Sequence, residues 1–93
     1  MTTFVLIGKY TGGSIGAISA KRTDEAKRIL GECGGKLVAG YATLGASDVV
    51  LVCELPGTEA ALKASILLTK ALGIAFETSP AIPVDAFDKL VGG

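Results

Sequence analysis

The order of strand-like and helix-like segments is the feature that most constrains the fold of this chain. Runs rich in β-branched and apolar residues, bounded by turn signals, favour strands at 3–10, 36–44, 48–55 and 74–79. Apolar residues at helical spacing follow the first and third runs. This β-α-β-β-α-β order predicts an α+β domain of ferredoxin-like topology, with a four-stranded antiparallel sheet and its helices on one face.

The two helices have recognisable start and stop residues. Ser19 and Thr58 are candidate N-caps, because their hydroxyl oxygens can accept a bond from a first-turn amide. Gly34, Gly35 and Gly73 supply the stops, since glycine readily takes the left-handed conformation at a helix C-terminus. One side of the first helix carries apolar residues spaced i, i+3, i+4, i+7: Ala26, Ile29, Leu30 and Cys33.

The C-terminal segment is predicted to leave the sheet as an extended strand end and to finish in a short helix. Pro80 and Pro83 bracket the extended exit. Asp85 can open the final helix, which places Phe87 and Leu90 on one side of it.

Both faces of the two central strands are apolar, although helices are expected on only one face. Ordinary half-exposed strands alternate apolar and polar residues. In the first strand Phe4 and Leu6 oppose Val5 and Ile7, and in the third Val50 and Val52 oppose Val49, Leu51 and Cys53.

The helix-free face therefore needs a cover. A monomer seldom exposes an apolar patch of several hundred Å². Four such side chains offer roughly 6 to 12 kcal/mol on burial, before association costs. We predict a homodimer or higher oligomer joined sheet to sheet. The alternative is that Phe87 and Leu90 fold over this face within one chain.

Composition excludes several classes of function. Nine basic and nine acidic residues give a net charge of zero, so nucleic acid and anionic membranes are not expected partners. The chain has no histidine and no C-x-x-C pair, which leaves a zinc site or a catalytic triad without its residues. Cys33 and Cys53 are predicted to be reduced packing residues. We expect no metal and no cofactor.

A chain of 93 residues fits one domain, residues 1–93. Lys63 and Lys70 interrupt the most apolar helix, so no segment reaches the roughly 18 residues of a membrane span. The first residues lack the basic n-region and the cleavage site of a signal peptide. We therefore expect a cytoplasmic protein.

Short motifs along almost the whole chain resemble those of the GYD domain family. The resemblance implies a ferredoxin-like domain related to the dimeric α/β barrels, and it implies almost nothing about activity. The motifs, in chain order, are Ile7-Gly8-Lys9-Tyr10-Thr11, Gly34-Gly35-Lys36-Leu37, Thr43-Leu44-Gly45-Ala46-Ser47-Asp48-Val49-Val50, Glu77-Thr78 and Phe87-Asp88-Lys89-Leu90.

The hairpin motif departs from the family at one position. Ser47 precedes Asp48 where the namesake motif would have tyrosine, so the resemblance gives no support for a role of that phenol here. Gly45 and Asp48 still fit the motif. Both have a structural explanation, because glycine permits positive φ in a hairpin and aspartate accepts backbone hydrogen bonds.

Four polar residues are candidates for binding a ligand: Lys9, Tyr41, Thr43 and Glu77. Lys9 and Tyr10 point to opposite faces of the first strand, so only one of them can enter a given cleft, whereas Tyr41 and Thr43 share a face. Glu77 lies in an otherwise apolar strand and is the one weak candidate for moving a proton.

Two further features of the sequence, an acidic residue in a strand and a group of glycines, have ordinary structural explanations. Glu54, near its strand end, is explained by solvent exposure or by a lysine partner. The glycines at 12, 13 and 16 lack the spacing of a phosphate-binding motif, so a flexible loop explains them better.

Two classes of function are compatible with these residues. The first is an oligomeric module without catalysis that binds a small apolar or mixed-polarity molecule, or a protein partner. The second is a cofactor-free enzyme of the dimeric α/β barrel type, similar to small monooxygenases or isomerases, with Glu77 moving the proton. A signalling trimer of the PII type ranks third, because no basic nucleotide-binding cluster is present.

Overall fold

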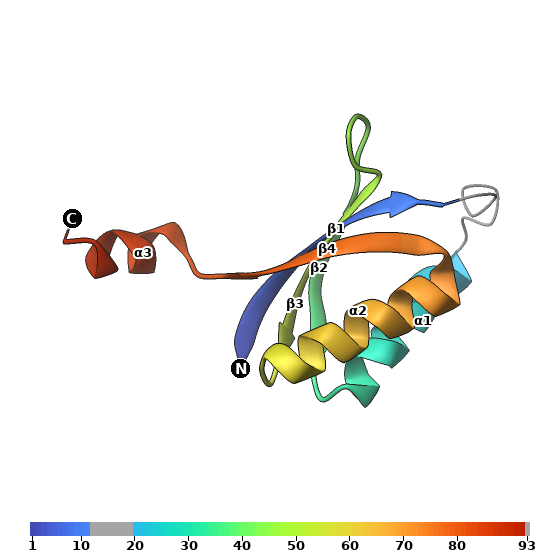
Figure 1. Cartoon of the computed structure of the whole chain (residues 1–93), viewed down its shortest axis with the longest axis horizontal. Helices are drawn as coiled ribbons and strands as arrows, with labels where there is room; N and C mark the ends of the chain where they lie inside the picture. The colour runs from blue at the N-terminus through green and yellow to red at the C-terminus, as the bar shows by residue number, and fades with distance from the viewer. Residues whose placement is uncertain (12–19, 93) are drawn as a thin grey trace.

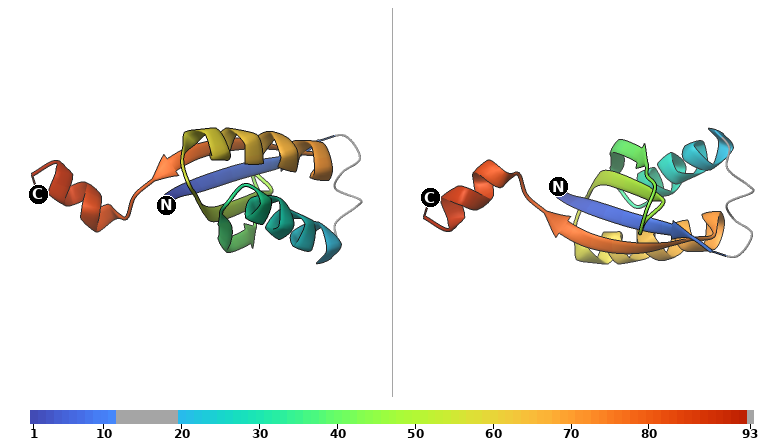
Figure 2. Two further views of the ribbon diagram at one scale, coloured as in Figure 1. Left: turned by 90° about the horizontal axis from the view of Figure 1, so that it is seen from below. Right: turned by 90° about the horizontal axis from the view of Figure 1, so that it is seen from above.

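The computed structural model describes residues 1–11 and 20–92, and its elements follow the predicted order (Figure 1). Within these residues four antiparallel strands form one sheet in the order β2-β3-β1-β4, so β1 and β3 are central as predicted. Two helices cover one face of the sheet (Figure 2), which confirms the ferredoxin-like α+β fold. The elements are β1 (Thr2–Tyr10), α1 (Ala20–Glu32), β2 (Lys36–Ala42), β3 (Val49–Leu55), α2 (Thr58–Leu72), β4 (Ile74–Ala81) and α3 (Val84–Leu90).

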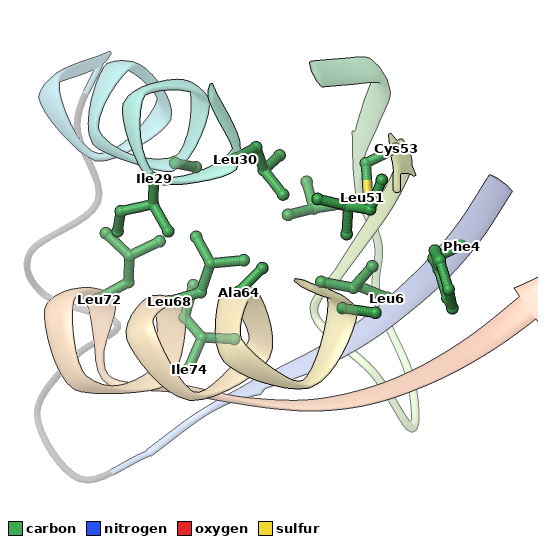
Figure 3. Close-up of a cluster of buried hydrophobic side chains, with 13 residues drawn as sticks. Phe4, Leu6, Ile29, Leu30, Leu51, Cys53, Ala64, Leu68, Leu72 and Ile74 are labelled. Atoms are coloured by element: carbon green, nitrogen blue, oxygen red, sulfur yellow. The ribbon is translucent and has the colours of Figure 1, made fainter. Parts of the chain in front are cut away.

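The hydrophobic core lies between α1, α2 and the sheet face that they cover (Figure 3). Leu6, Leu30 and Leu68 bring β1 and the two helices together and are fully buried. The predicted apolar side of α1 is confirmed, because Ala26, Ile29 and Leu30 belong to the core and Cys33 packs against it. The buried core residues are Phe4, Leu6, Ala26, Ile29, Leu30, Leu51, Cys53, Leu55, Ala61, Ala64, Leu68, Leu72 and Ile74.

Helix α1 ends as the glycine pair predicts. Gly34 has φ 85°, and its N–H donates to the carbonyl oxygen of Gly31 at 3.0 Å. The N–H of Gly35 donates to the carbonyl oxygen of Leu30 at 2.9 Å. These two bonds form a Schellman motif, which satisfies the last carbonyls of the helix. The predicted N-cap Ser19 and the glycines at 12, 13 and 16 lie outside the described residues.

Thr58 is the first helical residue of α2, so its predicted role as N-cap is wrong. The cap position falls on Gly57, which has an extended backbone, offers no side-chain cap and accepts the amide of Ala61 at 3.0 Å. The predicted stop at Gly73 is confirmed. This glycine has φ 69° and donates its N–H to the carbonyl oxygen of Thr69.

Strand boundaries differ from the sequence pattern by one residue at the starts of β1 and β3 and by two residues at the ends of β2 and β4. Strand β2 ends at Ala42 instead of residue 44, because the chain has already turned into the hairpin. Strand β4 continues through Pro80 to Ala81, two residues beyond its predicted end. Proline is tolerated there because β4 is an edge strand and needs no ladder N–H on its outer side.

The helix-free side of the sheet, here called the open face, carries an apolar patch at its centre. Val5 lies opposite Val52, and Ile7 lies opposite Val50. Tyr41 of β2 extends the patch, since it also lies opposite Val50. None of these five side chains belongs to the buried core, and Ile7 is 41% exposed. The prediction of central strands that are apolar on both faces is therefore confirmed.

The C-terminal segment does not cover the open face, so the predicted alternative of an intramolecular cover is wrong. Helix α3 projects away from the sheet (Figures 1 and 2), and it has no buried residue. It begins at Val84, one residue before the predicted Asp85. Pro83 precedes it with φ −57° and ψ 145°, a polyproline-like conformation that continues the direction of β4 instead of reversing it.

Candidate functional site

A groove of about 570 Å³ opens between α1 and the edge strand β2. Its floor is the helix side of the sheet, where Val49 and Leu51 of β3 adjoin Ile74 and Phe76 of β4. The volume lies within the range of small-molecule sites, which are typically about 300 to 1,000 Å³ and mostly apolar. The groove is therefore the candidate ligand site.

Small side chains leave this groove unfilled. The strand register pairs Gly40 with Leu51 and Ala42 with Val49, which places both β2 residues on the helix side of the sheet. Ala26 lines the groove from α1. In the sequence, the unfilled space is indicated by small residues at alternate positions of the second strand. Analysis of polarity alone misses it, because alanine and glycine count as neither polar nor bulky.

Two cations line the groove, and one of them lies against a phenol ring. The Arg22 guanidinium carbon lies 5.3 Å from the centroid of the Tyr10 ring, a cation–π distance, and the same side chain donates to the carbonyl oxygen of Leu72. Among the described residues that line the groove, Arg22 and Lys27 are the only charged ones, and both are positive. The groove thus combines an apolar floor with two positively charged side chains. Sequence analysis missed this role because charges on a helix usually face solvent.

The predicted ligand-binding residues do not converge on one site. Lys9 and Glu77 do not line the groove. Glu77 lies opposite Ile7 on the open face and is exposed, as is Lys9. Tyr41 lines the groove, at the edge of the sheet. The predicted parity of the first strand is confirmed, with Tyr10 at the groove and Lys9 on the opposite side.

Thr43, Gly45 and Asp48 build the hairpin between β2 and β3. The Thr43 hydroxyl donates to the carbonyl oxygen of Ser47 at 2.8 Å, and Gly45 has φ 128°. The Asp48 carboxylate accepts the backbone N–H of Tyr10 at 2.9 Å, which ties the hairpin to the end of β1. The structural explanation of Gly45 and Asp48 is therefore confirmed. Ser47 contributes only its backbone carbonyl oxygen, which accepts the Thr43 hydroxyl, and any residue at this position would offer the same acceptor.

Glu54 and the cysteines also have structural explanations. The Glu54 carboxylate lies 3.7 Å from the Lys36 ammonium, the lysine pairing that the sequence suggested. Both cysteines are free thiols; Cys53 is fully buried in the core and Cys33 is partly buried against it. Their predicted role as reduced packing residues is confirmed.

Alkaline pH should destabilise the protein through Cys53. Burial raises the pKa of this thiol from 9.0 to about 11. Because the unfolded chain releases the proton first, this contribution to stability is complete below about pH 9 and is lost between about pH 9 and pH 11. The free energy of unfolding should fall by about 2 to 3 kcal/mol across this window.

Urea unfolding of wild type and of Cys53→Ala at pH 8 and pH 11 isolates this effect from the titration of lysines and tyrosines. The variant has no thiol at this position and should lack this part of the alkaline fall. An equal fall in the two proteins would show that the thiol is not responsible.

The part of the chain that the structure describes holds no group of three His, Cys, Asp or Glu side chains placed to bind a metal ion. Among the same residues, no helix has the length and apolar character needed to cross a membrane.

These observations define a ferredoxin-like α+β domain with an apolar groove on its helical side and an uncovered apolar patch on the other. The chain belongs to the GYD domain family, whose model matches residues 4–91 of its 93 residues. No curated protein and no solved structure shows significant similarity to it. The family resemblance predicted from the motifs is confirmed, and the activity has to be argued from the groove.

Proposed function

We propose that this protein is a non-catalytic, homo-oligomeric binding protein for a small amphipathic anion. The observation that carries the proposal is the groove of about 570 Å³ between α1 and β2. An aromatic or aliphatic body would lie against Leu51 and Phe76 on the floor. A carboxylate or similar group would lie near Arg22 and Lys27, the charged residues that line the groove in the described part of the chain.

The chemistry of the groove supports an anion more than a neutral or cationic ligand. Apolar burial contributes most of the affinity at about 25 cal/mol per Å², and it does not distinguish charge. Lys27 is exposed and lies on the same side of the groove as Arg22, one helix turn and a half along α1. The two positive side chains in the groove lining favour one negative charge on the ligand.

The enzyme alternative has weaker support. It needs a proton-transfer group beside the bound substrate, and Glu77 is exposed on the open face while the groove lies on the helix side. A general base must lie within hydrogen-bond reach of the proton it takes. On the helix side of the sheet, the groove lining has the Tyr10 phenol in place of a carboxylate.

Self-association through the open face is the second part of the proposal. The patch of Val5, Ile7, Val50 and Val52 lies at the centre of the sheet, and α3 leaves it uncovered. A second copy presents the same patch, so two sheets can pack face to face about 10 Å apart around a two-fold axis. Apolar burial on both sides then stabilises the pair.

A matched pair of dyes tests the ligand site. 1-Anilinonaphthalene-8-sulfonate and N-phenyl-1-naphthylamine share their rings, and only the first carries a negative charge. The chain has two tyrosines and no tryptophan, and both Tyr10 and Tyr41 line the groove. Quenching of tyrosine emission by a bound dye therefore reports binding near either ring, and the groove variants below assign the signal to the groove. We expect both dyes to bind, the sulfonate more tightly.

Variants of the groove make the test specific. Gly40→Leu places a side chain in the groove, where its Cβ meets only the flexible end of Leu51 at 3.2 Å, and it should weaken both dyes by at least about tenfold. Lys27→Ala should weaken the sulfonate about threefold and leave the neutral dye unchanged. The matched control is Gly31→Leu, because nothing lies within 4 Å of a Cβ at that position. Equal binding to Gly40→Leu and wild type would contradict the proposal.

A further inference from the structure

The C-terminal arm, here residues 82–91, has an apolar stripe that its own chain does not cover. Helix α3 and the residue after it place four apolar side chains within an arc of about 120°, at about 100° per residue. The polar residues Asp85 and Lys89 lie on the other side of the helix. All of the apolar side chains of the arm are at least half exposed: Ile82, Val84, Phe87, Leu90 and Val91.

A helix this short does not hold itself together. Helix α3 has seven residues and buries none of them, whereas isolated helices shorter than about 12 residues are marginal in water. The arm also makes the molecule long. The radius of gyration is 13.8 Å, compared with about 12 Å for a compact domain of this size. The arm therefore needs a surface that its own domain does not supply.

We propose that the arm is exchanged between two copies of this chain, and that its apolar stripe packs onto the partner beside the paired open faces. This inference rests on the sheet-to-sheet dimer proposed above and says how that dimer is completed. The arm continues directly from β4, whose residues Glu77, Ser79 and Ala81 border the open face. The arm thus leaves from one edge of the open face.

The size of the open face supports the second copy as the occupant. Four strands about 4.8 Å apart and seven to nine residues long give a footprint of about 490 Å². A stable interface usually buries about 800 Å² on each partner. The paired sheets alone fall short of this area, and two reciprocal arms add to it on both sides.

The arm is long enough to reach a partner. Two extended residues and a seven-residue helix span about 17 Å. Packed sheets lie about 10 Å apart, so the length of the arm exceeds the distance between two paired sheets. A two-fold axis gives each chain one donated and one received arm.

The contribution of the stripe is measured by sedimentation of the purified chain. Phe87→Ala removes the one aromatic anchor of the arm and should raise the dissociation constant of the dimer about 30-fold. Lys89→Ala, on the polar side of the same helix, is the matched control and should change it less than about threefold. Because α3 buries nothing in its own chain, neither variant should change the circular dichroism spectrum of the domain. A dissociation constant unchanged by Phe87→Ala overturns the proposal.

Photo-crosslinking tests whether the apolar stripe of the arm contacts a partner chain. We would replace Phe87 by p-benzoylphenylalanine, irradiate at low micromolar concentration and map the crosslinked peptides by mass spectrometry. The expected result is a covalent pair of chains in high yield, with a much lower yield when the same label replaces Lys89. A dimer that gives no crosslink between chains at residue 87 overturns the exchanged arm and leaves the paired sheets standing. A monomer overturns both.

Discussion

Gly35→Ala is expected to lower the free energy of unfolding by about 3 kcal/mol, a large part of the stability of a small domain. A Cβ at this position would lie 2.0 Å from the carbonyl oxygen of Glu54 and 2.6 Å from Leu55 Cδ2. The leucine side chain can rotate, but the carbonyl oxygen belongs to the backbone of β3. The turn between α1 and β2 would have to move, which disturbs the Schellman motif and the edge of the sheet together.

The matched control for this prediction is the same substitution at Gly31, four residues earlier. Nothing lies within 4 Å of a Cβ there, and alanine favours a helix over glycine by roughly 0.5 to 1 kcal/mol. Gly31→Ala should therefore be as stable as wild type or slightly more stable. Urea unfolding monitored by circular dichroism measures both variants. If the free energy of unfolding of Gly35→Ala lies within 1 kcal/mol of the wild-type value, the close approach of the turn to β3 does not restrict residue 35 to glycine.

Val52→Lys is expected to raise the dissociation constant of the dimer roughly a thousandfold, about 4 kcal/mol. Val52 lies opposite Val5 at the centre of the open face. In a two-fold dimer the substitution occurs twice in one interface, so two ammonium groups would lose water at the apolar centre of the patch. In the single chain the position borders solvent, so the fold should survive.

Leu62→Lys is the control for this prediction. Leu62 is 62% exposed on α2, in the helical layer away from the open face, so a lysine there should leave the dimer intact. Sedimentation equilibrium gives the dissociation constants, and circular dichroism checks that each variant is folded. Dimers of equal strength in Val52→Lys and wild type would mean that the open face is not the interface.

The features of the fold that follow from local patterns were predictable. The lack of apolar–polar alternation identified β1 and β3 as apolar on both sides, and helical spacing identified Ile29 and Leu30 as core residues. Glycines at 34 and 73 marked helix ends because a left-handed residue is a local requirement of the chain. The one incorrect cap, Thr58, shows the limit of this approach, since the cap position depends on how the preceding turn leaves the strand.

The groove was not predictable in the same way, because it depends on contacts between residues far apart in the sequence. Tyr10 and Arg22 come from different elements and meet only in the folded chain. Gly40 and Ala42 matter for the space they leave, which no polarity pattern records. Glu77, chosen for its acidic character in an apolar strand, lies on the open face because strand parity places it there. Pro83 sets the direction of the C-terminal arm, but the sequence did not predict where the arm lies relative to the sheet.

The central claim is that this domain pairs through its open face and binds a small amphipathic anion in the groove of each chain. Native mass spectrometry of the purified protein, at low micromolar concentration and without a denaturing step, tests both parts at once. We predict the mass of two chains carrying a small molecule on each, with the added mass lost on denaturation. The mass of one bare chain would contradict both the pairing and the ligand binding.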